Sequence, residues 1–101
     1  MNYTVYYTQL FAEEFEEHLA YAVEQWGKPM LRAYRSRLEE LEQLLAYAPY
    51  TFEASQYHES QQTRKVRFYG PLVLYYDVND DTMRVTFLRL WHGRQGSWPN
   101  V

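Results

Sequence analysis

The sequence predicts an α+β fold, in which an N-terminal strand and a helical hairpin are followed by a three-stranded antiparallel meander, all strands forming one sheet. Three observations lead to this prediction. A short run of β-branched and aromatic residues opens the chain, and two stretches with helical apolar periodicity follow it. Three further strand-like runs, divided by turn sequences, occupy the last third. A helical hairpin packed on one antiparallel sheet is the simplest arrangement that buries both helical stripes.

The first strand and the first helix are predicted within residues 2–26. The run Tyr3-Thr4-Val5-Tyr6-Tyr7 has the composition of a strand. Thr8 suits the N-cap of the following helix, because its hydroxyl can accept a hydrogen bond from a free N–H of the first turn. Apolar residues then recur at helical spacing and indicate one buried face. They are Phe11, Phe15, Leu19, Ala22 and Trp26.

The second helix is predicted directly after the first. Gly27 is expected to end one helix and Pro29 to lie in the first turn of the next. So short a link favours an antiparallel hairpin. The second apolar stripe consists of Leu31, Tyr34, Leu38, Leu41 and Leu45. Four acids near the start of the first helix, which are expected to be solvated and to complement its dipole, are Glu13, Glu14, Glu16 and Glu17.

The remaining strands are predicted after a long connection over residues 48–62, and a connection of that length is often functional. The middle strand is apolar at nearly every position, as expected for a central strand covered on both faces. The three strands are Arg64–Phe68, Leu72–Val78 and Met83–Trp91, with Tyr69-Gly70-Pro71 and Asn79-Asp80-Asp81 as turns.

Length and composition limit the class of protein. A chain of 101 residues has room for one core, so residues 1–101 are expected to form a single domain. There is no cysteine, which excludes a disulfide scaffold and thiolate chemistry. No apolar run reaches the roughly 18 residues that span a bilayer, and the N-terminus lacks a basic leader, so a soluble cytoplasmic protein is expected.

The net charge of −3 conceals a division along the chain. Residues 1–62 carry ten acidic and four basic side chains, whereas residues 63–101 carry six basic and three acidic ones. An acidic or polyanionic partner should therefore prefer the C-terminal third.

The predicted strands carry a recognisable set of residues. The first contains Tyr3-Thr4-Val5-Tyr6, the second Arg64-Lys65-Val66-Arg67 and the third Leu74-Tyr75-Tyr76-Asp77-Val78. The fourth ends in Leu88-Arg89-Leu90-Trp91-His92-Gly93-Arg94, which is the most specific of these segments. Together with the order of elements and Leu10-Phe11-Ala12-Glu13-Glu14-Phe15, they resemble the RelE/ParE toxins of bacterial type II toxin–antitoxin systems.

This resemblance implies a RelE/ParE-like fold and a cytoplasmic, growth-inhibiting toxin of the kind found in plasmid-stabilisation systems. It also implies a cognate antitoxin that neutralises the toxin in a hetero-oligomer, with no cofactor and no membrane association. The RelE branch cuts messenger RNA on the ribosome without a metal ion. The ParE branch is associated with the poisoning of DNA gyrase.

Two features make the chain more similar to the ParE branch. RelE-type nucleases resemble one another in an arginine at the position that Val73 occupies, and valine cannot bind phosphate. Several also carry a tyrosine near the C-terminus, but no tyrosine follows Tyr76. A ParE-like toxin that binds its target is therefore the first hypothesis. The alternatives are a RelE-like endonuclease and a non-toxic domain that keeps only the fold and antitoxin binding.

The candidate site lies among the basic residues of the last third. In a nuclease, His92, Arg94 and Arg67 would be catalytic, because imidazole transfers protons near neutral pH and arginines stabilise charge on phosphate. Glu53, His58 or Glu59 would be the second proton carrier. In a toxin that acts by binding, the target-binding residues are Arg64, Lys65, Arg67, Arg89, His92 and Arg94.

Ordinary structural roles compete with these functions. Side chains alternate along a strand, so Lys65 and Arg67 should share one face and Arg64 the other. Arg89 could pair with an acid from a helix, and His92 with a neighbouring carbonyl group. His18 and His58 lack partners at metal-ligand spacing, so no metal site is expected. The tail, residues 95–101 with Trp98 and Pro99, either docks on the sheet or lies free.

Overall fold

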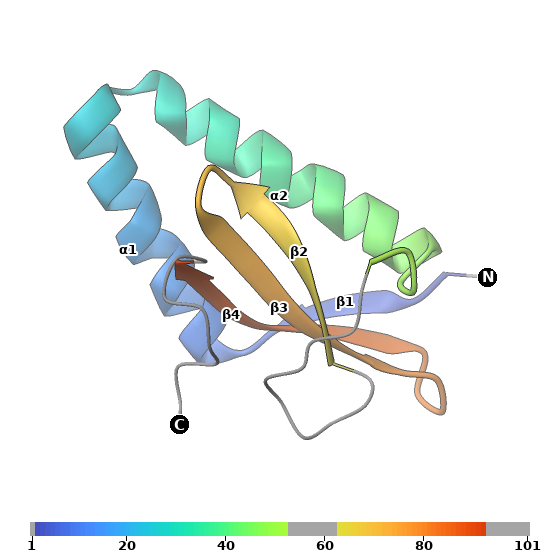
Figure 1. Cartoon of the computed structure of the whole chain (residues 1–101). Helices are drawn as coiled ribbons and strands as arrows, with labels where there is room; N and C mark the ends of the chain where they lie inside the picture. The colour runs from blue at the N-terminus through green and yellow to red at the C-terminus, as the bar shows by residue number, and fades with distance from the viewer. Residues whose placement is uncertain (1, 53–62, 93–101) are drawn as a thin grey trace.

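Six elements follow one another in the predicted order (Figure 1). The computed structural model describes residues 2–52 and 63–92. The elements are β1 (Thr4–Tyr7), α1 (Gln9–Trp26), α2 (Pro29–Tyr47), β2 (Thr63–Tyr69), β3 (Leu72–Asn79) and β4 (Arg84–His92).

One four-stranded sheet joins the strands in the order β1-β4-β3-β2. The last three strands form the predicted antiparallel meander, with β3 between its two neighbours. The prediction that the whole sheet is antiparallel is wrong, because β1 pairs with β4 in parallel, from Thr4 opposite Arg84 to Tyr7 opposite Phe87. A parallel pair needs a long crossover, and the helices with β2 and β3 supply it.

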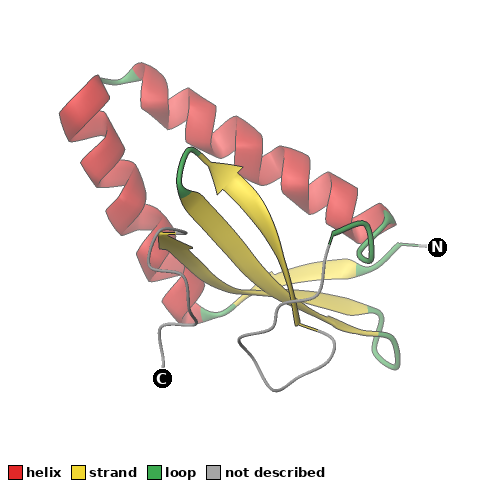
Figure 2. Cartoon of the chain, in the orientation of Figure 1, coloured by secondary structure: helices red, strands yellow, loops and turns green. Residues whose placement is uncertain are grey.

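Both helices cover the same face of the sheet and diverge from their short link like the arms of a V (Figure 2). Aromatic rings fill the space between the layers. Phe11 packs edge-on against Phe87 of β4 at 5.4 Å, and Phe68 of β2 packs edge-on against both Phe15 at 6.1 Å and Tyr34 at 5.6 Å. The aliphatic part of this core includes Leu19, Leu41, Leu45, Leu74 and Leu90, all buried.

Thr8 connects the first strand, the first helix and the last strand. Its hydroxyl accepts the Phe11 N–H at 2.9 Å, which is the predicted N-cap. The same hydroxyl donates to the carbonyl oxygen of Leu88 at 3.0 Å, and the Thr8 N–H donates to that of Phe87 at 3.0 Å. The end of β1 and the start of α1 are therefore both attached to β4.

β1 does not pair with β4 beyond Phe87. There, side chains of α1 form hydrogen bonds with the edge of β4 instead. The Glu14 carboxylate accepts the Leu90 N–H at 2.9 Å, and His18 Nε2 lies 3.1 Å from the Leu90 carbonyl oxygen. Glu14 also accepts the Arg89 Nε–H at 2.9 Å and pairs with its Nη2. The expectation that Glu14 is solvated is wrong, since only 6% of the residue is exposed.

The helix link makes both apolar stripes extend beyond the core. Gly27 ends α1 with φ of 94°, a left-handed conformation that glycine adopts without strain. The predicted burial of Trp26 and Leu31, on either side of this link, is wrong, because they are 64% and 39% exposed. The stripe positions nearer the sheet, from Phe11 to Ala22 and including Tyr34, Leu41 and Leu45, are buried as predicted.

The free edge of β2 is partly covered by α2. Arg37 Nε donates to the carbonyl oxygen of Phe68 at 2.7 Å, and its Nη2 donates to that of Arg67 at 2.6 Å. One guanidinium thus satisfies two backbone carbonyl groups of the edge strand. In the part of the chain that the structure describes, neither helix is long and apolar enough to cross a membrane.

Replacing Glu14 with alanine should lower the free energy of unfolding by about 3 kcal/mol, because Arg89 and the Leu90 N–H would both lose their acceptor in a largely buried site. Urea denaturation followed by circular dichroism measures this change. Glu17, an exposed residue on the same helix, is the matched control, and Glu17→Ala should change the value by less than about 0.5 kcal/mol. Equal effects of the two substitutions would contradict this role of Glu14.

Candidate functional site

Lys65 and Arg67 lie together on the open face, the sheet face turned away from α1 and α2. The cross-strand register places Arg67 opposite Val73, which is opposite Trp91, and Lys65 opposite Tyr75. Val66 and Phe68, which alternate with these two cations, are buried beneath the helices. Arg67 is exposed and Lys65 half-buried, and both line a shallow hollow with Val73. Two predicted target-binding residues are therefore brought together here.

Arg64 points to the opposite face, as strand alternation requires. Its Nη1 donates to the carbonyl oxygen of Phe52 at 2.6 Å, and its guanidinium lies 4.7 Å from the centre of the Tyr50 ring. Opposite it on β3, the hydroxyl of buried Tyr76 donates to the Pro49 carbonyl oxygen at 2.8 Å. Burial raises the pKa of Tyr76, so it stays a neutral donor. Arg64 and Tyr76 thus fasten the segment after α2 to the sheet.

The guanidinium of Arg89 is mostly buried and makes its contacts within the protein. It pairs with Glu14 of α1, and the side chains of the two partners are only 14% and 8% exposed. The same guanidinium lies 5.0 Å from the centre of the Trp91 ring. The structural alternative for Arg89, an ion pair with a helical acid, is therefore what the structure contains.

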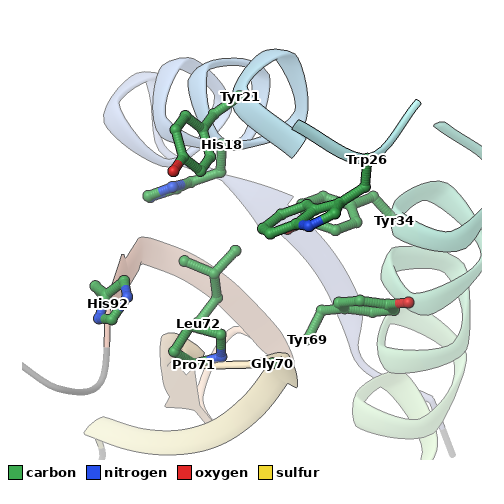
Figure 3. Close-up of a pocket in the computed structure, with 9 residues that line it drawn as sticks. All are labelled: His18, Tyr21, Trp26, Tyr34, Tyr69, Gly70, Pro71, Leu72 and His92. Atoms are coloured by element: carbon green, nitrogen blue, oxygen red, sulfur yellow. The ribbon is translucent and has the colours of Figure 1, made fainter. Parts of the chain in front are cut away.

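His92 ends β4 on the helical side of the sheet. It is opposite Leu72, a buried residue of the core, rather than in the rows that contain Lys65 and Arg67. There it faces a groove between the end of α1, the start of α2 and the β2–β3 turn (Figure 3). His92 thus lies on the other side of the sheet from Lys65 and Arg67.

This aromatic groove has a volume of about 520 Å³. His18 and His92 lie at one end, and Trp26 and Tyr69 at the other (Figure 3). Trp26 meets the Tyr21 ring edge-on at 6.0 Å, while Tyr69 packs against Tyr34 at 5.0 Å. The β2–β3 turn, which borders the groove, is formed at Gly70, where φ is 55°. The residues that line the groove are His18, Tyr21, Trp26, Tyr34, Tyr69, Gly70, Pro71, Leu72 and His92.

The sequence indicated an apolar groove with exposed aromatic rings for an antitoxin, but it did not locate the groove or name its lining residues. The signal was the aromatic content of 19%, which is compatible with either a core or an interface. Tyr21, Trp26 and Tyr69 are 58%, 64% and 39% exposed, so much of that content lies on the surface. A surface rich in exposed aromatic rings is typical of protein–protein contacts.

Several predicted site residues lie outside the described residues. They are Arg94, the tail over 95–101, and the second proton carriers Glu53, His58 and Glu59. Within residues 2–52 and 63–92, no group of three or more histidine, aspartate or glutamate side chains is placed to hold a metal ion.

A cluster of hydrogen-bonded polar side chains joins the N-terminus to the β3–β4 turn. Asp80 accepts the Tyr3 hydroxyl at 2.7 Å and the Tyr50 hydroxyl at 2.8 Å. These hydrogen bonds lower the pKa of Asp80, because they stabilise its charged form. Desolvation and the bond to Asp80 raise the pKa of Tyr50 to about 12. The cluster holds Tyr50 beneath the guanidinium of Arg64.

Comparison with known proteins identifies the family. The protein-family model of the ParE toxin of the type II toxin–antitoxin system parDE matches residues 5–96. The chain belongs to this family. It is therefore a type II toxin–antitoxin toxin of the RelE/ParE superfamily, and the resemblance to the ParE branch is confirmed. A comparison with curated protein sequences finds no significant match.

Solved structures with the same fold include three toxin–antitoxin systems. The chromosomal ParDE system from P. aeruginosa is 16% identical with a TM-score of 0.69, and the match covers 89% of this chain and 95% of that one. The RelBE2 complex from Mycobacterium tuberculosis is 21% identical with a TM-score of 0.63, covering 91% and 99%. The E. coli DinJ–YafQ complex is 14% identical with a TM-score of 0.64, covering 95% and 98%. The predicted fold class is confirmed by these likenesses.

The Asp80 carboxyl should titrate below the ordinary range of an aspartate in an NMR pH titration. Since its folded-state pKa is lowered, it stabilises the fold above its unfolded-state pKa, and this stabilisation is lost as pH falls through the folded-state value. The double substitution Tyr3→Phe and Tyr50→Phe should return the pKa towards its ordinary value. An unchanged Asp80 titration in that variant would show that the two hydroxyl groups are not the cause.

Proposed function

We propose that this chain is a ParE-like toxin that arrests growth in the cytoplasm by binding a target such as DNA gyrase through its open face. Lys65 and Arg67 provide the charge of that surface, and Val73 and Trp91 lie in the same cross-strand row as Arg67. Surface charge of this kind steers an acidic target or a protein–DNA complex towards its binding site. Arg94, which lies outside the described residues, is kept in the proposal as a further contact.

One observation carries the choice of binding over cleavage. His92 lies on the helical side of the sheet, whereas Lys65 and Arg67 lie on the open face. Metal-independent RNA cleavage needs a base, an acid and cations within hydrogen-bond reach of one phosphate. His92 does not form such a group with Lys65 and Arg67, and Val73 adds no cation between them. This supports a toxin that acts by association.

The same proposal includes a cognate antitoxin. The structures most relevant to this question are complexes of a toxin with an antitoxin, as in RelBE2 and DinJ–YafQ. The exposed aromatic groove supports such a partner here, since a protein that covers it would remove a large apolar surface from water. An antitoxin bound in the groove would leave the open face, on the other side of the sheet, uncovered. It would therefore neutralise the toxin by hindering the approach of the target, for example through its bulk.

Arg67→Glu should weaken association with the target by at least about tenfold, because it reverses the exposed charge of the open face. The measurements are growth arrest on induction of the toxin alone and binding to purified DNA gyrase. Arg84→Glu is the matched control, since Arg84 is exposed at the other end of the sheet and changes the net charge equally.

His92→Ala separates the two mechanisms in the same assays. A toxin that acts by binding through the open face should keep its growth arrest in this variant. Loss of arrest with His92→Ala, together with full arrest by Arg67→Glu, would overturn the proposal and favour the endonuclease.

A further inference from the structure

The corner between α1 and α2 exposes apolar side chains on both helices. Trp26 and Leu31 continue the buried stripes of their helices, yet they are 64% and 39% exposed because the sheet does not reach them. Trp26 lines the aromatic groove on one side of the corner. Leu31 lines a second, shallower hollow of about 690 Å³ on the outer face of α2. Only Gly27 separates Trp26 from Lys28, the first residue of that hollow.

The second hollow is basic. Lys28, Arg32 and Arg35 line it together with Leu31, and Glu39 lies at its far end. These three cations are on the side of α2 opposite its buried positions Tyr34, Leu41 and Leu45. Within residues 2–52 and 63–92, the ion pairs of the structure are Arg37 with Glu40 and Arg89 with Glu14, so none of the three is paired with a described acid.

The charge at the start of α2 opposes the helix dipole. Lys28 is the N-cap residue and makes no side-chain capping bond, and the first turn contains no acid. A cation at a helix N-terminus is unfavourable because the free N–H groups already carry positive charge. Arg32 and Arg35 add two further cations in the next turns, before the acids Glu39, Glu40 and Glu42. The result is a concentrated positive potential at the corner, which suits an acidic partner.

We propose that this corner, defined by Trp26, Lys28, Leu31, Arg32 and Arg35, is the docking site of an acidic segment of the cognate antitoxin. An apolar side chain of the antitoxin covers Trp26 at the end of the aromatic groove. The acidic residues that follow it lie across Lys28, Arg32 and Arg35. This inference rests on the proposed function, to which it adds the place and the chemistry of antitoxin recognition.

The charges of the two helices determine the direction of the segment. Besides Glu14, which is paired with Arg89, α1 carries four acids and no lysine or arginine, so it repels an acidic segment that leaves the groove. The first half of α2 attracts it, and Trp26 and Lys28 are close enough in sequence for a few residues to contact both. A segment with an apolar anchor followed by acidic residues therefore fits across the corner onto α2.

The test is the affinity of the purified toxin for the product of the small open reading frame beside its own, measured by isothermal titration at low and high salt. Arg32→Glu and Arg35→Glu should each weaken binding by at least about tenfold at low salt, with a smaller effect at high salt. Trp26→Ala should weaken it by at least about tenfold at both, because buried aromatic anchors dominate interface energies.

Each variant has a matched control in the same chain. Arg84→Glu makes the same charge change on the open face, and Tyr47→Ala removes an aromatic ring that is 76% exposed at the far end of α2. Both controls should bind the antitoxin as the wild type does. Growth arrest by the corner variants expressed alone should be unchanged, whereas co-expressed antitoxin should no longer rescue growth.

The possible results distinguish a failure of the proposed docking site from a failure of the proposed function. If the wild-type chain binds the product and the corner variants bind it equally well, the docking site is elsewhere and the proposed function stands. If the wild-type chain does not bind it at all, the proposed antitoxin partner fails and the corner with it. If Trp26→Ala instead abolishes self-association of the toxin in sedimentation experiments and leaves antitoxin affinity unchanged, the corner binds a second copy and the proposal is overturned.

Discussion

β1 pairs with only the first half of β4, so the second half of β4 has an edge whose polar groups need partners from elsewhere. The N-cap Thr8 supplies a partner at Leu88, and Glu14 and His18, in successive turns of α1, supply partners at Leu90. The ion pair between the Glu14 and Arg89 side chains holds α1 against the same part of β4. This attachment holds α1 against the end of the sheet, and thereby positions the aromatic groove and the corner with α2.

The fold presents two chemically different surfaces on opposite sides of one sheet. The open face has Lys65 and Arg67 beside Val73, while the helical side has the aromatic groove that includes His92. A catalytic centre would need these groups together, whereas a toxin that has both a target and an antitoxin can use them apart. The basic start of α2 belongs to the helical side, so one helix both closes the core and offers charge to a partner.

Local patterns in the sequence predicted the elements, the Thr8 N-cap, the antiparallel meander and the separation of Arg64 from Lys65 and Arg67. Periodicity identified the apolar face of each helix, but it does not show how far the opposing sheet extends, so Trp26 and Leu31 were expected in the core. The pair of Glu14 and Arg89 joins residues far apart in sequence, and no local signal marks Glu14 among its acidic neighbours. The parallel pairing of β1 likewise depends on which edge of the meander is free, which only the packed helices determine.

Mapping RNA 5′ ends across the transcriptome after induction of the toxin alone tests most directly whether this fold acts by binding rather than by cleavage. A toxin whose cations and histidine lie on opposite sides of the sheet should arrest growth without new 5′ ends inside coding sequences, and should instead induce DNA-damage signalling. Abundant ribosome-dependent cuts within codons, lost in His92→Ala, would contradict the account and would identify the chain as an endoribonuclease.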